Sequence, residues 1–400
     1  MVELSAKTEP GKRLVALAET LAEDIRPAAA AHDHDGSFPF ESLSAVKASG
    51  YLRAPVPEAL GGLGVASVHD LVVASSRLAR GDAALTLGVN MHLVYVVSLL
   101  RRWQAAVEEQ NQRRVAAFGR SLEQIARDRI VFAAAISEPS QDLTRPAMVA
   151  VKNGDGWTLS GRKHFCTMSP AADALYASVT YRDARGRETY GYAIVPTSTP
   201  GVRVHDDWDA LGMRASGSNS VSFEDVHLPA RALRGGFPAG STTGYLERNL
   251  EAGLFHAAAS LGVAEDAHAR VVAQIRGNGS EPDGRARMLA AENAVDLSAC
   301  RAVLARAATL IDEHLADGGR ADLIVLFGEA QAAKTFVGES SVRVVDRSLA
   351  LSGGAGYVNG SPLARAYRDV RATPLMHPLG ANRAYDYLGE LALGRTPTLH

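Results

Sequence analysis

The sequence has little that would mark a secreted, metal-binding or membrane protein. Its 400 residues contain two cysteines, Cys166 and Cys300, which lie far apart and lack the spacing of metal ligands. Two isolated cysteines do not build a disulfide framework, and reduced thiols in a cytoplasmic enzyme are the expected state. No N-terminal apolar segment resembles a signal peptide, and no apolar run reaches the length of a transmembrane helix. We expect a cytoplasmic protein without a metal centre or a membrane partner.

An excess of charge of either sign is also missing. The 42 basic and 44 acidic residues leave a net charge of −2, so the charge balance does not recruit nucleic acid or an anionic membrane. The hydrophobic fraction of 46% and the charged fraction of 22% are those of a soluble globular protein. A chain of 400 residues exceeds one ordinary hydrophobic core and indicates two or three domains.

What the sequence does contain is a change of pattern along the chain. Residues 1–130 have helical spacing, as in the three- and four-residue steps of Leu14, Leu17, Leu21 and Ile25. Residues 131–235 instead carry short runs of alternating β-forming residues, such as 174–181 and 189–195, separated by turn signals. Residues 236–400 return to helical spacing, with helices expected at 242–275, 287–315, 322–351 and 383–393. These patterns predict an N-terminal helical domain, a middle β domain and a C-terminal four-helix bundle.

Several short motifs are distributed along these three predicted domains. They are Gly61-Gly62-Leu63-Gly64, Ile136-Ser137-Glu138-Pro139, Gly161-Arg162-Lys163 with Phe165-Cys166-Thr167, Leu211–Ser216, and Gly353-Gly354 with Arg368-Asp369. Together they resemble the acyl-CoA dehydrogenase superfamily along nearly the whole chain. The resemblance implies the acyl-CoA dehydrogenase-like fold, with an N-terminal α-helical bundle, a middle β-barrel or sandwich and a C-terminal four-helix bundle. It also implies a flavin-dependent oxidoreductase that assembles as a homotetramer.

The resemblance implies that the cofactor is FAD or FMN. The residues that it places around the flavin are Ile136, Ser137, Phe165, Thr167, Ser216, Gly353, Gly354 and Arg368. The hydroxyls of Ser137 and Thr167 suit the polar edge of an isoalloxazine ring, and Phe165 suits its face. The glycine pair lets backbone amides approach a phosphate, or the cofactor of an adjacent subunit. Without the family, the same features are consistent with a core phenylalanine, hydroxyls that cap strand ends and glycines that end a helix.

The superfamily's catalytic carboxylate is missing at both of its usual positions. The position nine residues after Arg368 is His377. The alternative position, ten residues before Gly262, is Ala252, although Glu251 is adjacent. The motif that holds the partner's flavin diphosphate is replaced by residues 275–279, and the usual Gly-Ser-Asp segment is replaced by residues 140–143. The chain therefore lacks the dehydrogenation base at its usual positions, and it lacks contacts that would retain the flavin.

These losses are tolerable in the superfamily's reduced-flavin-dependent monooxygenases. The resemblance implies that such enzymes take diffusible reduced flavin from a separate flavin reductase and activate oxygen on it. They often carry a histidine at the position of His377, a serine at that of Ser169, and a histidine on an N-terminal helix, for which His92 is the candidate. A neutral imidazole can accept a substrate proton near neutral pH. For His92, a packed helix histidine is equally consistent with the sequence.

Three hypotheses follow. The first is a reduced-flavin-dependent monooxygenase that oxidises a hydrophobic or aromatic small molecule with O2. The second is an acyl-CoA or acyl-carrier-protein thioester dehydrogenase or oxidase that introduces an α,β double bond, with Glu251 as the base. The third is a binding protein that has lost catalysis. A purified protein that carries tightly bound yellow flavin favours the second, and a colourless protein that needs added flavin and reductase favours the first.

Overall fold

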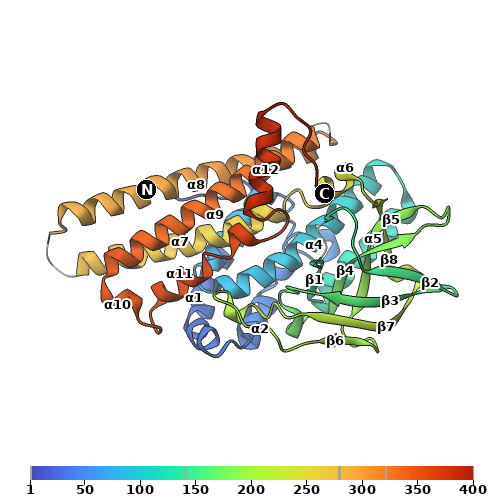
Figure 1. Cartoon of the computed structure of the whole chain (residues 1–400), viewed down its shortest axis with the longest axis horizontal. Helices are drawn as coiled ribbons and strands as arrows, with labels where there is room; N and C mark the ends of the chain where they lie inside the picture. Colours follow the sequence, from blue (N-terminus) through green and yellow to red (C-terminus); the bar gives the residue numbers. More distant parts are fainter. Residues whose placement is uncertain (1, 140–141, 278–280, 320–321, 400) are drawn as a thin grey trace.

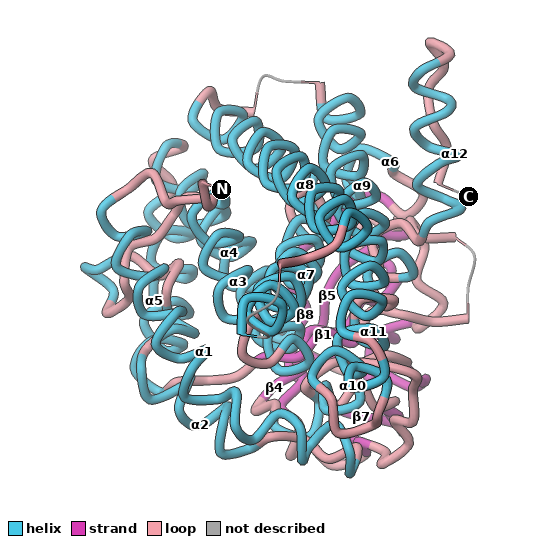
Figure 2. The backbone as a smooth tube through the Cα atoms, turned by 90° about the vertical axis from the view of Figure 1, so that its left-hand side faces the viewer, coloured by secondary structure: helices cyan, strands magenta, loops and turns pink. Residues whose placement is uncertain are grey.

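The computed structural model describes residues 2–139, 142–277, 281–319 and 322–399, and it has three parts in chain order (Figure 1). Helices form the first part, eight strands form the second, and helices form the third. Figure 2 shows the long helices of the third part side by side, with the strands lying beyond them. Residues 140–141 of the replaced segment and residues 278–280 of the replaced diphosphate motif lie outside the described residues.

The N-terminal part is built around a buried helix. Its five α-helices are α1 (Glu9–Asp35), α2 (Phe40–Ser49), α3 (Val68–Ala79), α4 (Ala83–Glu108) and α5 (Gln112–Asp128). Helix α1 continues through Pro27, where the sequence suggests a kink or a boundary. Helix α4 is long and apolar enough to cross a membrane by length and composition, yet 83% of its most apolar window is buried inside the protein. It therefore serves as a core helix of this fold.

The strands form one sheet in the order β6-β7-β3-β2-β4-β5-β8, and β1 pairs with β4 in parallel. Their bounds are β1 (Phe132–Ala135), β2 (Val149–Asn153), β3 (Gly156–Lys163), β4 (Ala174–Arg182), β5 (Glu188–Pro196), β6 (Val202–Val204), β7 (Val221–Pro229) and β8 (Leu233–Pro238). Because side chains alternate along a strand, β4 serves two cores. Leu175 and Val179 pack with Phe223 inside the folded sheet, whereas Tyr176 packs with Val96 of α4. The sheet is thus fixed directly against the core helix.

The C-terminal part contains α6 (Thr242–Arg248), α7 (Ala252–Gly277), α8 (Gly284–Ala316), α9 (Leu323–Ser352), α10 (Gly354–Tyr357), α11 (Pro362–Asp369) and α12 (Ala381–Ala392). Helices α7, α8 and α9 pack against one another, and α11 and α12 pack on α9. The sequence predicts one helix over 242–275, but the structure interrupts it between Arg248 and Ala252. The interruption places Asn249 and Glu251 outside regular helix, beside the turn that carries His377.

Candidate active site

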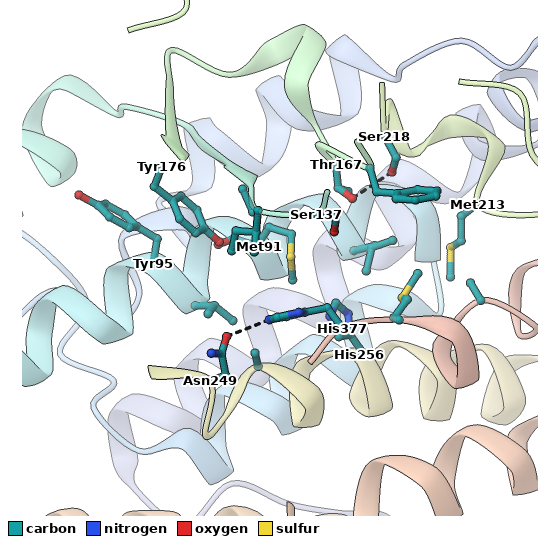
Figure 3. Close-up of a pocket in the computed structure, with 18 of the residues that line it drawn as sticks. Met91, Tyr95, Ser137, Thr167, Tyr176, Met213, Ser218, Asn249, His256 and His377 are labelled. Atoms are coloured by element: carbon teal, nitrogen blue, oxygen red, sulfur yellow. Dashed lines mark hydrogen bonds between the residues drawn. The ribbon is translucent and has the colours of Figure 1, made fainter. Parts of the chain in front are cut away.

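A partly open cavity lies where the three parts meet. Its volume is about 510 Å³, and α4, the sheet, the start of α7 and the turn at residues 375–377 supply its walls. Figure 3 shows hydroxyl side chains on one wall and imidazoles on the wall that faces it. Six of the predicted flavin or catalytic residues line this cavity, namely Ile136, Ser137, Phe165, Thr167, Arg368 and His377. The structure therefore brings together residues up to 241 positions apart in the chain, from 136 to 377.

The first wall, which we call the hydroxyl wall, consists of Ser137, Thr167 and Ser218. The loop after β3 and the loop before β7 pair through their backbones, since Cys166 N donates to Asn219 O and Met168 N donates to Ser216 O, both at 2.9 Å. This pairing places the Thr167 and Ser218 hydroxyls 2.9 Å apart (Figure 3). Hydroxyls both donate and accept, so the wall can bind the mixed donors and acceptors on the polar edge of a planar heterocycle.

Phe165 and Met213 lie within these two loops and carry unusual backbone angles. Their φ values are 54° and 53°, in the left-handed region that non-glycine residues rarely adopt. The Phe165 side chain is 64% exposed and stands edge-on to Trp208, with ring centroids 6.1 Å apart. Strained backbone and exposed aromatic surface at a cavity are features of ligand sites. Together with the hydroxyl wall, they fit an isoalloxazine ring.

The opposite wall, which we call the imidazole wall, consists of His256, His377 and Asn249. Asn249 Nδ2 donates to the backbone oxygen of Tyr245 at 2.8 Å, so its Oδ1 faces His377 Nε2, also at 2.8 Å. An amide oxygen only accepts, and His377 therefore carries its hydrogen on Nε2 and keeps a lone pair on Nδ1. Burial, with a smaller contribution from the charge of Lys334, lowers the pKa of His377 to about 3. The imidazole is neutral at working pH.

Lys334 of α9 supports the turn that presents His377. Its ammonium is almost fully buried and donates to the backbone oxygens of Met376 and Leu379, the latter at 2.6 Å. No carboxylate among the described residues forms an ion pair with it. Burial lowers the pKa of Lys334 to about 7. The turn is thus fixed by the buried Lys334 amino group behind the imidazole wall, which is a cation below about pH 7.

The other predicted catalytic residues do not line the cavity. Ser169 is buried, and its hydroxyl donates to Gly217 O at 3.2 Å. His92 is buried between three elements: its Nε2 donates to Leu52 O at 3.0 Å, and its Nδ1 accepts from Phe132 N at 3.2 Å. Glu251 is buried in an ion pair with Arg101 at 2.8 Å. The catalytic roles of these residues remain predictions without support from their positions.

Ser216, Gly353 and Gly354 do not line the cavity, whereas Arg368 lines it with a guanidinium that is already paired. The Ser216 hydroxyl bonds that of Ser218 at 2.7 Å, so it supports the hydroxyl wall from behind. The Arg368 guanidinium is engaged by Asp33, with Nη1–Oδ1 at 2.9 Å, and so links α11 to α1. Gly353 and Gly354 lie in open space at the end of α9. Their predicted contact with a phosphate or an adjacent subunit stays a prediction.

Sequence reasoning missed His256, Asn249 and three arginines that line the cavity, Arg102, Arg234 and Arg248. His256 lies one helical turn after Ala252, the position at which the superfamily's alternative base was sought. That spacing was a usable signal for a residue on the same helix face. The arginines come from α4, β8 and α6, and no motif connects them in the sequence.

Replacing Thr167 by valine is expected to weaken flavin binding by about 1–3 kcal/mol, because the variant loses one or two hydrogen bonds at the hydroxyl wall. Fluorescence titration with FMN measures the change. Thr197→Val is the matched control, since the Thr197 hydroxyl donates to Ala172 O at 2.8 Å and does not line the cavity. Equal flavin affinity in both variants would place the ring elsewhere.

The buried histidines are expected to make the protein acid-sensitive. Burial lowers the pKa of His92 to about 4 and those of His256 and His377 to about 3, whereas an unfolded chain titrates histidine near 6.5. Between those values the unfolded chain binds more protons, so stability is full above pH 6.5 and falls as pH decreases toward 4.

Two carboxyls oppose this acid effect. Burial raises the pKa of Asp369 to about 7 and also raises that of Asp82, so these groups bind extra protons in the folded state. A net uptake of one or two protons on unfolding lowers stability by on the order of 1–3 kcal/mol per pH unit. Thermal unfolding at pH 7.5 and pH 5 tests this, and His92→Gln is expected to reduce the difference. Equal melting temperatures at both pH values contradict it.

Comparison with known proteins agrees with this architecture. Family models of the acyl-CoA dehydrogenase N-terminal, middle and C-terminal domains match residues 14–118, 133–226 and 254–377. The chain is 33% identical over 395 residues to the amino sugar nitrososynthase DnmZ of Streptomyces peucetius, covering 97% of this chain and 95% of that protein.

Two solved structures are also similar. KijD3 in complex with FMN and dTDP-3-amino-2,3,6-trideoxy-4-keto-3-methyl-D-glucose has 31% identity and a TM-score of 0.90, with 98% of this chain and 96% of that chain covered. TdsC from Paenibacillus sp. A11-2, crystallised with FMN and indole, has a TM-score of 0.84 over 97% of this chain and 99% of its own. Its 24% identity supports a likeness of fold alone. The chain therefore belongs to the acyl-CoA dehydrogenase superfamily, and it is a flavin-dependent oxidoreductase.

Proposed function

We propose that this protein is a two-component monooxygenase that uses reduced FMN and O2 to oxidise the amino nitrogen of a nucleotide-linked amino sugar to a nitroso group. The observation that carries the proposal is the similarity of the whole chain to proteins named as amino sugar nitrososynthases, at 32–33% identity over 395–398 residues. The names of these relatives specify amino sugars, and so they do not support the hydrophobic or aromatic substrate that we expect from the sequence. Bound reduced flavin would supply two electrons per O2, so the conversion needs two rounds, each with one reduced FMN and one O2. The first round gives the hydroxylamine and one water, and the second converts the hydroxylamine to the nitroso group and releases two waters.

Three arginines at one end of the cavity support a nucleotide-linked substrate. Arg102, Arg234 and Arg248, which we call the arginine end, line both the cavity and the wider groove into which it continues. None of the three forms an ion pair with a carboxylate of the described chain. Burial, helped by the charge of Arg248, lowers the pKa of Arg102 to about 10. Unneutralised guanidinium groups in a half-buried position suit the oxygens of a diphosphate.

The residues of the chain then have separate tasks. The hydroxyl wall and Phe165 hold the flavin ring, and the arginine end holds the diphosphate. Met91, Met213 and Met376 line the space between them and exclude water from it. The imidazole wall faces the hydroxyl wall across this space (Figure 3). A sugar amine bound there would lie between the flavin and His377, whose Nδ1 keeps a lone pair.

The alternative functions have less support from the site. Thioester dehydrogenation needs a carboxylate beside the flavin, but Glu251 is engaged by Arg101 outside the cavity, and His377 occupies the other position. A binding protein without catalysis does not require two neutral imidazoles opposite a flavin site. We therefore favour the monooxygenase function over the dehydrogenase and the binding protein.

Reconstitution with FMN tests the proposal. The purified protein is expected to be colourless and to bind reduced FMN more tightly than oxidised FMN in anaerobic titration. With NADH, a flavin reductase, FMN and the dTDP-amino sugar named above, mass spectrometry is expected to show the amine converted to hydroxylamine and nitroso products. Catalase is added so that free hydrogen peroxide does not oxidise the amine. Flavin turnover that yields peroxide alone, with no change in the amine, would overturn the proposal.

We also propose that the protein is a cytoplasmic homotetramer. Helices α8 and α9 expose apolar side chains on their outer faces, and the largest among them are Met288, Val295, Val325 and Phe336. Apolar groups on a bundle face are typical of subunit interfaces. Multi-angle light scattering at micromolar concentration is expected to give four times the mass of 42.3 kDa. A monomer mass would contradict the assembly.

A further inference from the structure

The composition of the cavity lining determines which charge state of a ligand it can accept. Among the described residues, the cavity is lined by five arginines and two histidines and by no aspartate or glutamate. The nearby carboxyls have other partners: Asp33 is bound to Arg368, Glu251 to Arg101, and Asp369 accepts from Met213 N at 2.6 Å. An ammonium group placed in this cavity would therefore find no anionic partner in the described chain.

The imidazole wall strengthens this effect at the place where the substrate nitrogen is expected. His256 lines the cavity with a side chain that is 4% exposed, and its Nδ1 is buried without a hydrogen-bond partner among the described residues. The ring nitrogen available to a ligand is therefore Nε2. Burial, Lys334 and His377 together lower the pKa of His256 to about 3. Both imidazoles are neutral hydrogen-bonding groups in front of the buried Lys334, which is a cation below about pH 7.

The charged and titratable groups that line the cavity or contact the imidazole wall come from several elements. They are Arg102 of α4, Arg234 of β8, Arg248 of α6, His256 of α7, Lys334 of α9, His377 of the turn, Arg368 of α11 with the following Arg371, and the phenols Tyr95, Tyr176, Tyr192 and Tyr245. Burial raises the pKa values of Tyr95 and Tyr176, so these phenols remain neutral. All of the charged groups in this set are cations, so the electrostatic potential at the wall disfavours a positive ligand.

We propose that the cavity admits the amino group of its substrate in the uncharged form, and that His256 and His377 select this form as neutral hydrogen-bonding partners. The inference rests on the proposed function. It has a chemical consequence, because a nitrogen forms a bond to oxygen through its lone pair and an ammonium ion has none. The proton is then lost to solvent before binding, so no residue needs to remove it. The first oxygenation balances as R–NH2 + O2 + FMNH2 → R–NHOH + FMN + H2O: the N–O bond forms, the O–O bond breaks, and reduced FMN is oxidised.

Binding measurements test this inference separately from catalysis. Isothermal titration with the dTDP-amino sugar is expected to show affinity that rises about tenfold per pH unit until the pH reaches the pKa of the ligand's own amine. The control ligand is dTDP-glucose, which has the same diphosphate and no amine, and its affinity is expected to stay constant over the same range. Equal pH profiles for the two ligands, or tighter binding of the amine at low pH, would overturn the inference.

A pair of variants provides a second test. His256→Asp introduces an anion into the imidazole wall and is expected to bind the amine at least tenfold more tightly than wild type at pH 6. Its affinity for the amine is therefore expected to depend less steeply on pH. The matched variant His256→Asn has nearly the same shape without the charge and is expected to keep the wild-type slope. The inference is wrong if His256→Asp, shown by circular dichroism to be folded, retains the wild-type slope. Failure of the proposed function instead appears as the absence of hydroxylamine and nitroso products at every pH.

Discussion

Replacing His377 by alanine is expected to lower turnover about 10²–10⁴-fold, the usual contribution of a positioned proton-transfer or hydrogen-bonding group. His377 lines the cavity, and Asn249 leaves its Nδ1 as an acceptor toward the substrate. Within the described part of the chain, the His377 side chain hydrogen-bonds to Asn249 alone, and Lys334 contacts backbone oxygens of the turn, so the variant leaves those contacts in place. Folding and reduced-FMN affinity are therefore expected to stay near wild type.

Steady-state turnover, thermal unfolding and FMN titration of the same preparation check this prediction. His34→Ala is the control, because His34 lies exposed at the end of α1 and is expected to tolerate the change. Asn249→Ala is expected to reduce turnover less than His377→Ala, since it frees the ring orientation but keeps the imidazole. A wild-type rate in His377→Ala would show that the residue only forms part of a turn before Pro378.

Removing two charges from the arginine end is the second large expected effect. Hydrogen bonds to charged groups contribute about 1.5–3 kcal/mol each, so Arg102→Met combined with Arg248→Met is expected to raise KM for the nucleotide-linked substrate about 10²–10⁴-fold. The turnover number at saturation is expected to change much less, because the arginine end lies away from the hydroxyl wall. Methionine retains much of the apolar stem that packs near Tyr192, over which Arg248 lies at 4.6 Å.

Two controls separate the arginine end from a general change of surface charge. Arg187→Met removes an exposed arginine that pairs with Asp183 on the far hairpin, and it is expected to leave KM unchanged. Binding of dTDP alone is expected to weaken as much as binding of the whole substrate does. If KM is unchanged in the double variant, the diphosphate binds elsewhere and the arginines serve another purpose.

The order of helical and β parts and several residues that line the cavity are predictable because they depend on local patterns. Alternation at 174–181 predicts a strand whatever it packs against, and motifs such as Phe165-Cys166-Thr167 keep their register in the family. The position of His377 follows from counting along such a motif. These features require no knowledge of which helix lies next to which.

Features that depend on tertiary packing could not be read in the same way. The break before α7 is invisible in the sequence because Asn249-Leu250-Glu251 contains neither proline nor glycine, and contacts with the His377 turn and with Arg101 fix it. His256 stands in an alanine-rich run whose spacing is that of a core helix. His92 was equally consistent with packing and with catalysis, and its two backbone hydrogen bonds show that it joins α4 to β1.

The most direct test of the proposed chemistry is a single turnover in 18O2. The protein is loaded anaerobically with one equivalent of reduced FMN and the dTDP-amino sugar, mixed with 18O2, and the products are separated and weighed by mass spectrometry. The proposal predicts a hydroxylamine that carries one 18O atom, formed in proportion to the FMN oxidised. FMN oxidised to completion with an unchanged amine, or a product whose new oxygen comes from water, would contradict it.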